Sequence, residues 1–166
     1  MKHTISVLVR NEAGVLSRVA DLFSGRGYNI ESLTVAPTLD NDYSRLTIIT
    51  FGDDDVIEQI TKQLNRIIPV LKVTDLNTVE YIEREIILCK VTARDDVRSE
   101  ILRIAEIFDA KIIDVTNKTY TIQAFGDTRQ INSLIELLKP MGIKELVRSG
   151  KVAISRENQF VNLKNI

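Results

Sequence analysis

A short segment of the chain combines residue types that suit the binding of a small charged molecule. The segment RNEAGVLSRVADLFSGRGYNI, residues 10–30, carries Asn11 and Gly14 near its start and Asn29 near its end. Apolar residues recur at helical spacing from Val15 onward, so the first two polar residues precede a helix. The first N–H groups of a helix lack partners within it and favour an anion. A glycine at that point lets a ligand approach the backbone.

An amino acid matches this set of donors and acceptors. Its carboxylate suits the helix N-terminus, and its ammonium group suits carbonyl oxygens such as those of asparagine side chains. The segment contains neither GxGxxG nor a Walker loop, so it does not predict a nucleotide site. A plain structural turn, with an asparagine that satisfies the backbone, explains the same residues and stays open at this point.

The elements that must position this segment alternate between strand and helix periodicity. Apolar Ile5, Val7 and Val9 share one face of a first strand, and Gly25 and Gly27 close the helix that follows. Two extended runs, a helix with an acidic start and a strand after a proline complete the unit, at residues 28–38, 44–52, 53–67 and 69–76. The predicted order is strand, helix, strand, strand, helix, strand (βαββαβ).

The second half of the chain repeats this order. RVADLF (18–23) aligns with RIAEIF (103–108) at an offset of 85 residues, and TIITFGD (47–53) aligns with TIQAFGD (121–127) at an offset of 74. The first repeat therefore holds about 11 extra residues, which predicts a longer hairpin between its second and third strands. We predict an α+β fold of two tandem ferredoxin-like units, each with its helices on one face of an antiparallel sheet.

The two predicted domains, residues 1–77 and residues 78–166, differ at the polar positions of the opening segment. The second domain, which ends in a polar tail, keeps the core positions of the first. The counterparts of Asn11, Gly14 and Asn29 in it are Asp96, Ser99 and Asp114. A feature confined to one copy of a repeat points to function, so only the first domain is expected to hold an amino-acid site.

The composition argues against several classes of protein. Lys and Arg total 22 against 23 Asp and Glu, and aromatic residues make up 5%, so we expect no nucleic-acid partner. The single cysteine, Cys89, lies in the apolar run EIILCKV and is interpreted as a buried strand residue in a reducing compartment. We find no signal-peptide core and no apolar run of about 20 residues, so we expect a cytoplasmic protein without a membrane span.

No set of catalytic or metal-binding residues emerges from the sequence. His3 is the only histidine, and no second ligand or nucleophile is arranged around it. The serines lack a GxSxG context. Arg18, Arg45 and Arg103 fit charged positions on helix surfaces and strand edges better than a phosphate clamp. We predict a non-catalytic protein without a metal site.

These same residues resemble a known family. The run NEAGVLSRVADLFSGRGYNIESL is similar to an ACT domain, the small-molecule sensing module of amino-acid metabolism. RLTIITFGDD, QLNRIIPVLKVTDL and REIILCKV are similar to the small regulatory subunit of acetolactate synthase (acetohydroxyacid synthase). The resemblance extends from Met1 to about Arg156 and omits the tail ENQFVNLKNI. It implies an ACT domain followed by an ACT-like domain, in a regulatory subunit of branched-chain amino acid (valine, leucine and isoleucine) biosynthesis.

The resemblance also implies partners, cofactors and a site. A large catalytic subunit would join two pyruvates, or pyruvate and 2-oxobutyrate, with thiamine diphosphate, Mg²⁺ and FAD, none of them on this chain. The small subunit would stimulate it and confer feedback inhibition by valine. ACT domains pair side by side in a homodimer, with effector between the first strand-to-helix turn of one copy and the second strand of the other. The implied effector-binding residues are Asn11, Ala13, Gly14, Val15, Leu16, Asn29 and Ile30.

An alternative function is a stand-alone amino-acid-sensing ACT regulator of another enzyme or of transcription. A transcriptional regulator is expected to carry a helix-turn-helix, which we do not find before the first strand. A catalytic function would require the missing set of reactive residues. The first interpretation is therefore favoured.

Overall fold

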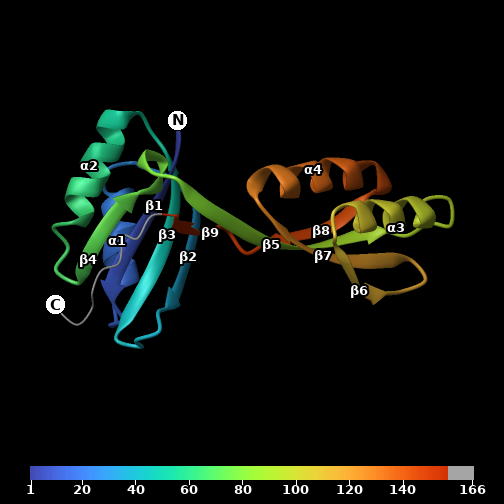
Figure 1. The fold of residues 1–166 in the computed structure, drawn as a ribbon, viewed down its shortest axis with the longest axis horizontal. Coiled ribbons are helices and arrows are strands. Elements are labelled where there is room, and N and C mark those ends of the chain that lie inside the picture. The colour runs from blue at the N-terminus through green and yellow to red at the C-terminus, as the bar shows by residue number, and fades with distance from the viewer. Residues whose placement is uncertain (157–166) are drawn as a thin grey trace. The chain divides into compact units, whose positions relative to one another are not determined.

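The computed structural model describes residues 1–156, and the predicted polar tail, residues 157–166, lies outside the described part. Within it the βαββαβ order occurs twice, as the repeats predict (Figure 1). The first set is β1 (Lys2–Arg10), α1 (Val15–Ser24), β2 (Ile30–Pro37), β3 (Tyr43–Phe51), α2 (Asp54–Leu64) and β4 (Val70–Asp75). The second set is β5 (Tyr81–Thr92), α3 (Arg98–Ile107), β6 (Lys111–Val115), β7 (Thr119–Gly126), α4 (Thr128–Leu138) and β8 (Ile143–Arg148), followed by β9 (Val152–Ser155).

Both sheets are antiparallel, and the predicted α+β class is confirmed. The first sheet has the strand order β2-β3-β1-β4, which leaves β2 at one edge. The second has the order β6-β7-β5-β8, and β9 pairs with β5. The hairpin between β2 and β3 is longer than that between β6 and β7, as the different offsets of the repeats predict.

The core of the first unit lies between its sheet and its two helices. Ile5 and Val7 on β1, Ile48 on β3, Val19 on α1 and Ile60 on α2 are all fully buried in it. Alternate residues of a strand point to opposite faces, and so the alternating apolar residues of β1 meet the helical stripe of α1. The opposite face of this sheet, which α1 and α2 leave uncovered, is called the outer face below.

The core of the second unit repeats this arrangement and includes the predicted buried cysteine. Cys89 on β5 is fully buried among apolar side chains of the sheet and of α3 and α4. Burial raises the pKa of the Cys89 thiol to about 11, because a charged thiolate would lose its hydration. The thiol is therefore protonated at neutral pH and is a core residue rather than a nucleophile.

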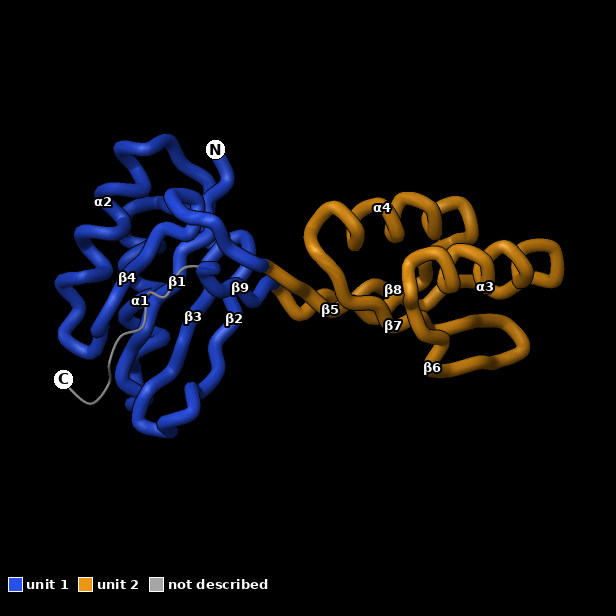
Figure 2. Tube along the Cα trace, viewed as in Figure 1, with its two compact units in different colours: residues 1–82, 151–166 blue, residues 83–150 orange. Residues whose placement is uncertain are grey.

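The compact units differ in their bounds from the predicted domains 1–77 and 78–166. Among the described residues, one unit consists of residues 1–82 and 151–156, and the other of residues 83–150 (Figure 2). The final strand returns to the first unit through backbone and side-chain hydrogen bonds. The Thr34 hydroxyl donates to the Lys151 carbonyl oxygen at 2.7 Å, and the Arg156 N–H donates to the Glu80 carbonyl oxygen at 2.8 Å. Hydrogen bonds between residues so far apart leave no pattern in the local sequence. The prediction from the repeat therefore placed β9 in the second domain.

Candidate functional site

Gly14 forms the turn between β1 and α1 in a conformation that other residues rarely adopt. It is the N-cap residue of α1, with φ +85° and ψ −5°. An added Cβ at this position would meet nothing within 4 Å, so the backbone here is open to an approaching molecule. The left-handed conformation strains an L-residue, which explains the glycine on local grounds.

The N-terminus of α1 has no negative group to satisfy it. The Asp53 side chain accepts the N–H of Val56 at α2, and the Asp127 side chain accepts the N–H of Gln130 at α4. At α1 no side chain forms a cap hydrogen bond, and the first turn has no acidic residue. The Val15 N–H donates to the Glu12 carbonyl oxygen at a long 3.5 Å, and the N–H groups that follow it, with the positive end of the helix dipole, are available to an external anion.

Asn11 lies beside this turn and is held by the β2–β3 hairpin. Its side-chain amide donates to the Asn41 carbonyl oxygen at 2.8 Å, and its backbone N–H donates to the Asp42 carbonyl oxygen at 2.7 Å. In the described part of the chain the Asn11 side-chain oxygen receives no hydrogen bond. An exposed, positioned acceptor next to an uncapped helix suits a ligand that carries both an ammonium and a carboxylate group.

The structure separates Asn29 from Asn11 within one chain. Asn29 immediately precedes β2, where Ile30 pairs with Thr50, and its carbonyl oxygen accepts the Thr50 hydroxyl at 2.7 Å. The Asn11 turn lies at the other end of β3, where Arg10 pairs with Tyr43. The strand advances seven residue steps from Tyr43 to Thr50, which is about 23 Å of extended chain. A single chain therefore does not bring both asparagines to one ligand.

The remaining residues implied by the family resemblance contribute in different ways. Ala13 is exposed, and Leu16 is 43% exposed, so both offer apolar surface at the turn. Val15 is only 4% exposed because its side chain packs in the core, which leaves only its backbone near the turn. Ile30 is half-buried at the start of β2.

The matching turn of the second unit has a different structure and carries an arginine that bonds to neighbouring loops. Helix α3 begins at Arg98, so Ser99, the counterpart of Gly14, lies inside its first turn. The Arg98 guanidinium donates to the carbonyl oxygens of Ala93 and Asn117 at 2.9 and 2.8 Å. It also pairs with the Asp95 carboxylate at 3.0 Å.

The described residues provide little for catalysis. His3 is buried, and its Nδ1 lies 3.0 Å from a carboxylate oxygen of Asp75, while its Nε2 has no partner. Residues 1–156 hold no group of three or more histidines, cysteines or carboxylates placed to bind a metal ion. Among the helices of that part, none is long and apolar enough to cross a membrane.

The βαββαβ order and the antiparallel sheet of the first unit are those of an ACT-type domain. A family model described as an AHAS small subunit-like ACT domain matches residues 5–72, and one described as the small subunit of acetolactate synthase matches residues 84–157. The chain belongs to the acetolactate synthase small subunits, which are regulatory and non-catalytic. Membership implies association with an acetolactate synthase large subunit.

Individual relatives resemble the chain over most of its length. The acetolactate synthase small subunit of Aquifex aeolicus is 56% identical over 94% of this chain and 82% of its own. The isozyme 3 small subunit of Escherichia coli is 47% identical over 97% of this chain and 99% of its own. The crystal structure of the small subunit from Thermotoga maritima has a TM-score of 0.86 at 40% identity, covering 95% of this chain and 99% of that chain.

Proposed function

We propose that this chain is a valine-responsive subunit whose effector sites are each shared by two copies. Valine binds at the β1–α1 turn of one copy and at the start of β2 in the other. The chain stimulates the large catalytic subunit in the cytoplasm, and thiamine diphosphate, Mg²⁺ and FAD are held by that large subunit. The separation of Asn11 and Asn29 to opposite ends of one sheet is the observation that carries the shared site.

The edge position of β2 supports side-by-side pairing of two copies. An edge strand presents unpaired N–H and C=O groups, and a second copy can satisfy them by extending the sheet. Antiparallel pairing of β2 (Ile30–Pro37) with itself about its centre brings Ile30 of one copy beside Pro37 of the other. Pro37 pairs with Ser44, next to the strand end that carries the Asn11 turn. The two halves of the site then meet.

The chemistry of these groups supports valine as the ligand. Its carboxylate accepts hydrogen bonds from the unpaired N–H groups at the start of α1, and its ammonium group donates to the Asn11 side-chain oxygen. Its short branched side chain fits the apolar surface of Ala13 and Leu16. We expect no equivalent site in the second unit, because its turn has a different structure and Arg98 bonds there to neighbouring loops.

Reconstitution with a cognate large subunit tests the regulatory part of the proposal. We expect the isolated chain to form no acetolactate, the large subunit alone to be weakly active and insensitive to valine, and the mixture to be more active and inhibited by valine. The assay measures acetolactate from pyruvate with thiamine diphosphate, Mg²⁺ and FAD present. Equal valine sensitivity with and without the small subunit would contradict the proposal.

Subunit mixing tests the sharing of the site. Neither an Asn11→Ala chain nor an Asn29→Ala chain alone should bind valine, whereas their heterodimer regains one intact site. After complete exchange of equal amounts, about one site in four should be intact. Calorimetry measures the recovered binding, and mass spectrometry of differently tagged chains confirms exchange. The control is the homodimer of a chain that carries both substitutions, taken through the same exchange procedure. No recovery despite proven exchange would rule out sharing.

A further inference from the structure

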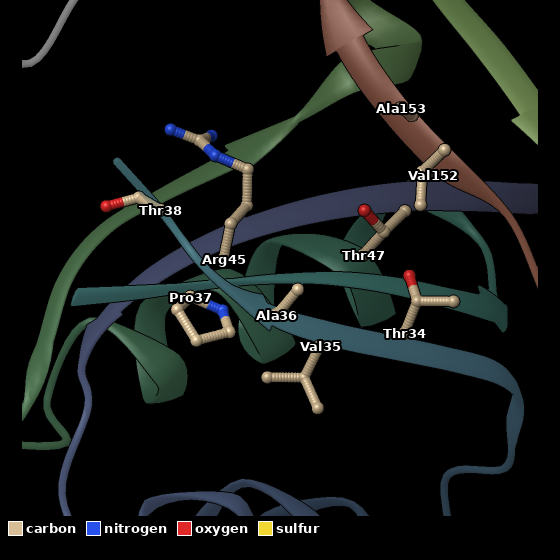
Figure 3. A pocket seen from close by; sticks show the side chains of 9 residues that line it. All are labelled: Thr34, Val35, Ala36, Pro37, Thr38, Arg45, Thr47, Val152 and Ala153. Carbon is tan, nitrogen blue, oxygen red and sulfur yellow. The ribbon is translucent and has the colours of Figure 1, made fainter. Parts of the chain in front are cut away.

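A hollow in the first unit lies on the outer face of the sheet, away from the helices. It is bounded by the end of β2, by β3 and by β9, as Figure 3 shows, and has a volume of about 350 Å³. All of its lining residues belong to one compact unit. They are Thr34, Val35, Ala36, Pro37, Thr38, Arg45, Thr47, Val152 and Ala153.

Arg45 supplies this hollow with a positive charge that has no counter-ion. Its Nη1 donates to the Ser6 hydroxyl at 3.0 Å, and within residues 1–156 no carboxylate pairs with it. A guanidinium has five N–H donors in a planar fork that matches a carboxylate, so most of these donors remain available. Figure 3 places the guanidinium on the same side of the sheet as the side chain of Thr47.

Thr47 supplies a polar group that the protein leaves unsatisfied. The residue is only 4% exposed, yet its hydroxyl has no hydrogen-bond partner among the described residues. Within residues 1–156 the buried side-chain atoms that lack a partner are His3 Nε2 and Ser32 Oγ, so the Thr47 hydroxyl is accessible to solvent and can bond to water or to a ligand. By contrast, Thr34 donates to Lys151, and Thr38 donates to Asp40. The Thr47 hydroxyl is therefore free to bind a ligand.

The rest of the lining is apolar and sets the size of the ligand. Ala36, Val152 and Ala153 provide short aliphatic walls, whereas the side chains of Val35 and Pro37 lie on the other side of β2 from Thr47 (Figure 3). At about 30 Å³ for each water molecule, the hollow has the volume of roughly twelve waters. This suits a ligand of about ten non-hydrogen atoms, with one anionic end and a small branched body.

We propose that this hollow is a binding site for a small aliphatic 2-oxo carboxylate. The Arg45 guanidinium pairs with the carboxylate, and the Thr47 hydroxyl donates a hydrogen bond to the oxo oxygen. Ala36, Val152 and Ala153 contact the aliphatic part. The site needs no ammonium group, which separates its ligand class from that of the β1–α1 turn. A single chain provides all the groups named, so the site stands independently of the proposed shared valine site.

The test uses the full-length chain and 3-methyl-2-oxobutanoate as the probe. We expect saturable binding in calorimetry, and shifts of the amide signals of Thr34, Thr47 and Ala153 in NMR spectra. Arg45→Gln should weaken binding at least about tenfold through loss of a charge-assisted pair, and Thr47→Val about threefold or more. Arg66→Gln, at an exposed arginine after α2, is the matched control and should bind as wild type.

Two further comparisons test whether the carboxylate is required and whether the hollow binds independently of the β1–α1 turn. The neutral ketone 3-methyl-2-butanone lacks the carboxylate and should not saturate, and Gly14→Asp should leave probe binding unchanged. No binding of the probe to the wild-type chain would overturn the proposal. So would equal binding by a folded Arg45→Gln chain, or amide shifts confined to the β1–α1 turn. If the chain failed to bind valine but bound the probe, the proposed site in the hollow would still hold, because valine binding and probe binding are measured separately.

Discussion

Gly14→Asp is expected to abolish valine inhibition of the reconstituted enzyme while leaving its stimulation largely intact. The new carboxylate would occupy the uncapped start of α1 and repel the carboxylate of valine. A loss of only ~1.4 kcal/mol already weakens binding about tenfold. The fold should survive, because the position is exposed, a Cβ meets nothing within 4 Å, and an acidic residue suits a helix start. The measurement is a valine titration of the holoenzyme.

Gly14→Asn separates charge from backbone strain in this experiment. Asparagine tolerates a positive φ about as well as aspartate does but adds no charge. We expect it to reduce valine sensitivity less than Gly14→Asp. Unchanged sensitivity in both variants would remove Gly14 from the site. Loss of stimulation in a folded Gly14→Asp chain would instead place the turn at the contact with the large subunit.

Arg148→Met is expected to cause the largest loss of stability in the second unit. The Glu85 side chain on β5 is 3% exposed, and two of its oxygens accept hydrogen bonds from the Arg148 guanidinium on β8. Removing the arginine leaves a buried carboxylate without its partner, which costs about 3 kcal/mol in comparable cases. Urea denaturation followed by amide NMR signals of residues 83–150 measures the change.

Two controls identify the cause of that loss. Lys90→Met breaks the pair between Lys90 and Glu145, whose side chains are 42% and 65% exposed, and should change stability by less than about 1 kcal/mol. Combining Arg148→Met with Glu85→Gln removes the unpaired charge and should recover part of the loss. An Arg148→Met chain as stable as the Lys90→Met chain would show that the buried pair contributes little.

The local pattern of the sequence was sufficient for the elements and their order. The alternation at Ile5 and Val7 and the helical stripe around Val19 predict the strand and helix that the structure contains. Asp53 and Asp127 mark the starts of α2 and α4, where their side chains accept backbone N–H groups. These features depend on residues close together in the chain, so they can be predicted before the fold is known.

The sequence comparison of the repeats also predicted that the two turns differ. The replacement of Gly14 by Ser99 indicates a changed backbone, and the structure starts α3 earlier than the alignment suggests. It did not reveal the hydrogen bonds of Arg98 to Ala93 and Asn117, because these two acceptors are distant from one another along the chain.

What the sequence determined by itself was the fold class, the family and the residues of the β1–α1 turn. Only the tertiary structure decided that Asn11 and Asn29 lie at opposite ends of one sheet, since strand register fixes that separation. It also decided that β9 returns to the first unit and that Arg45 and Thr47 face a hollow beside it. The physical reason is that these relations arise from hydrogen bonds and packing between residues far apart in the chain, which leave no periodicity in the local sequence.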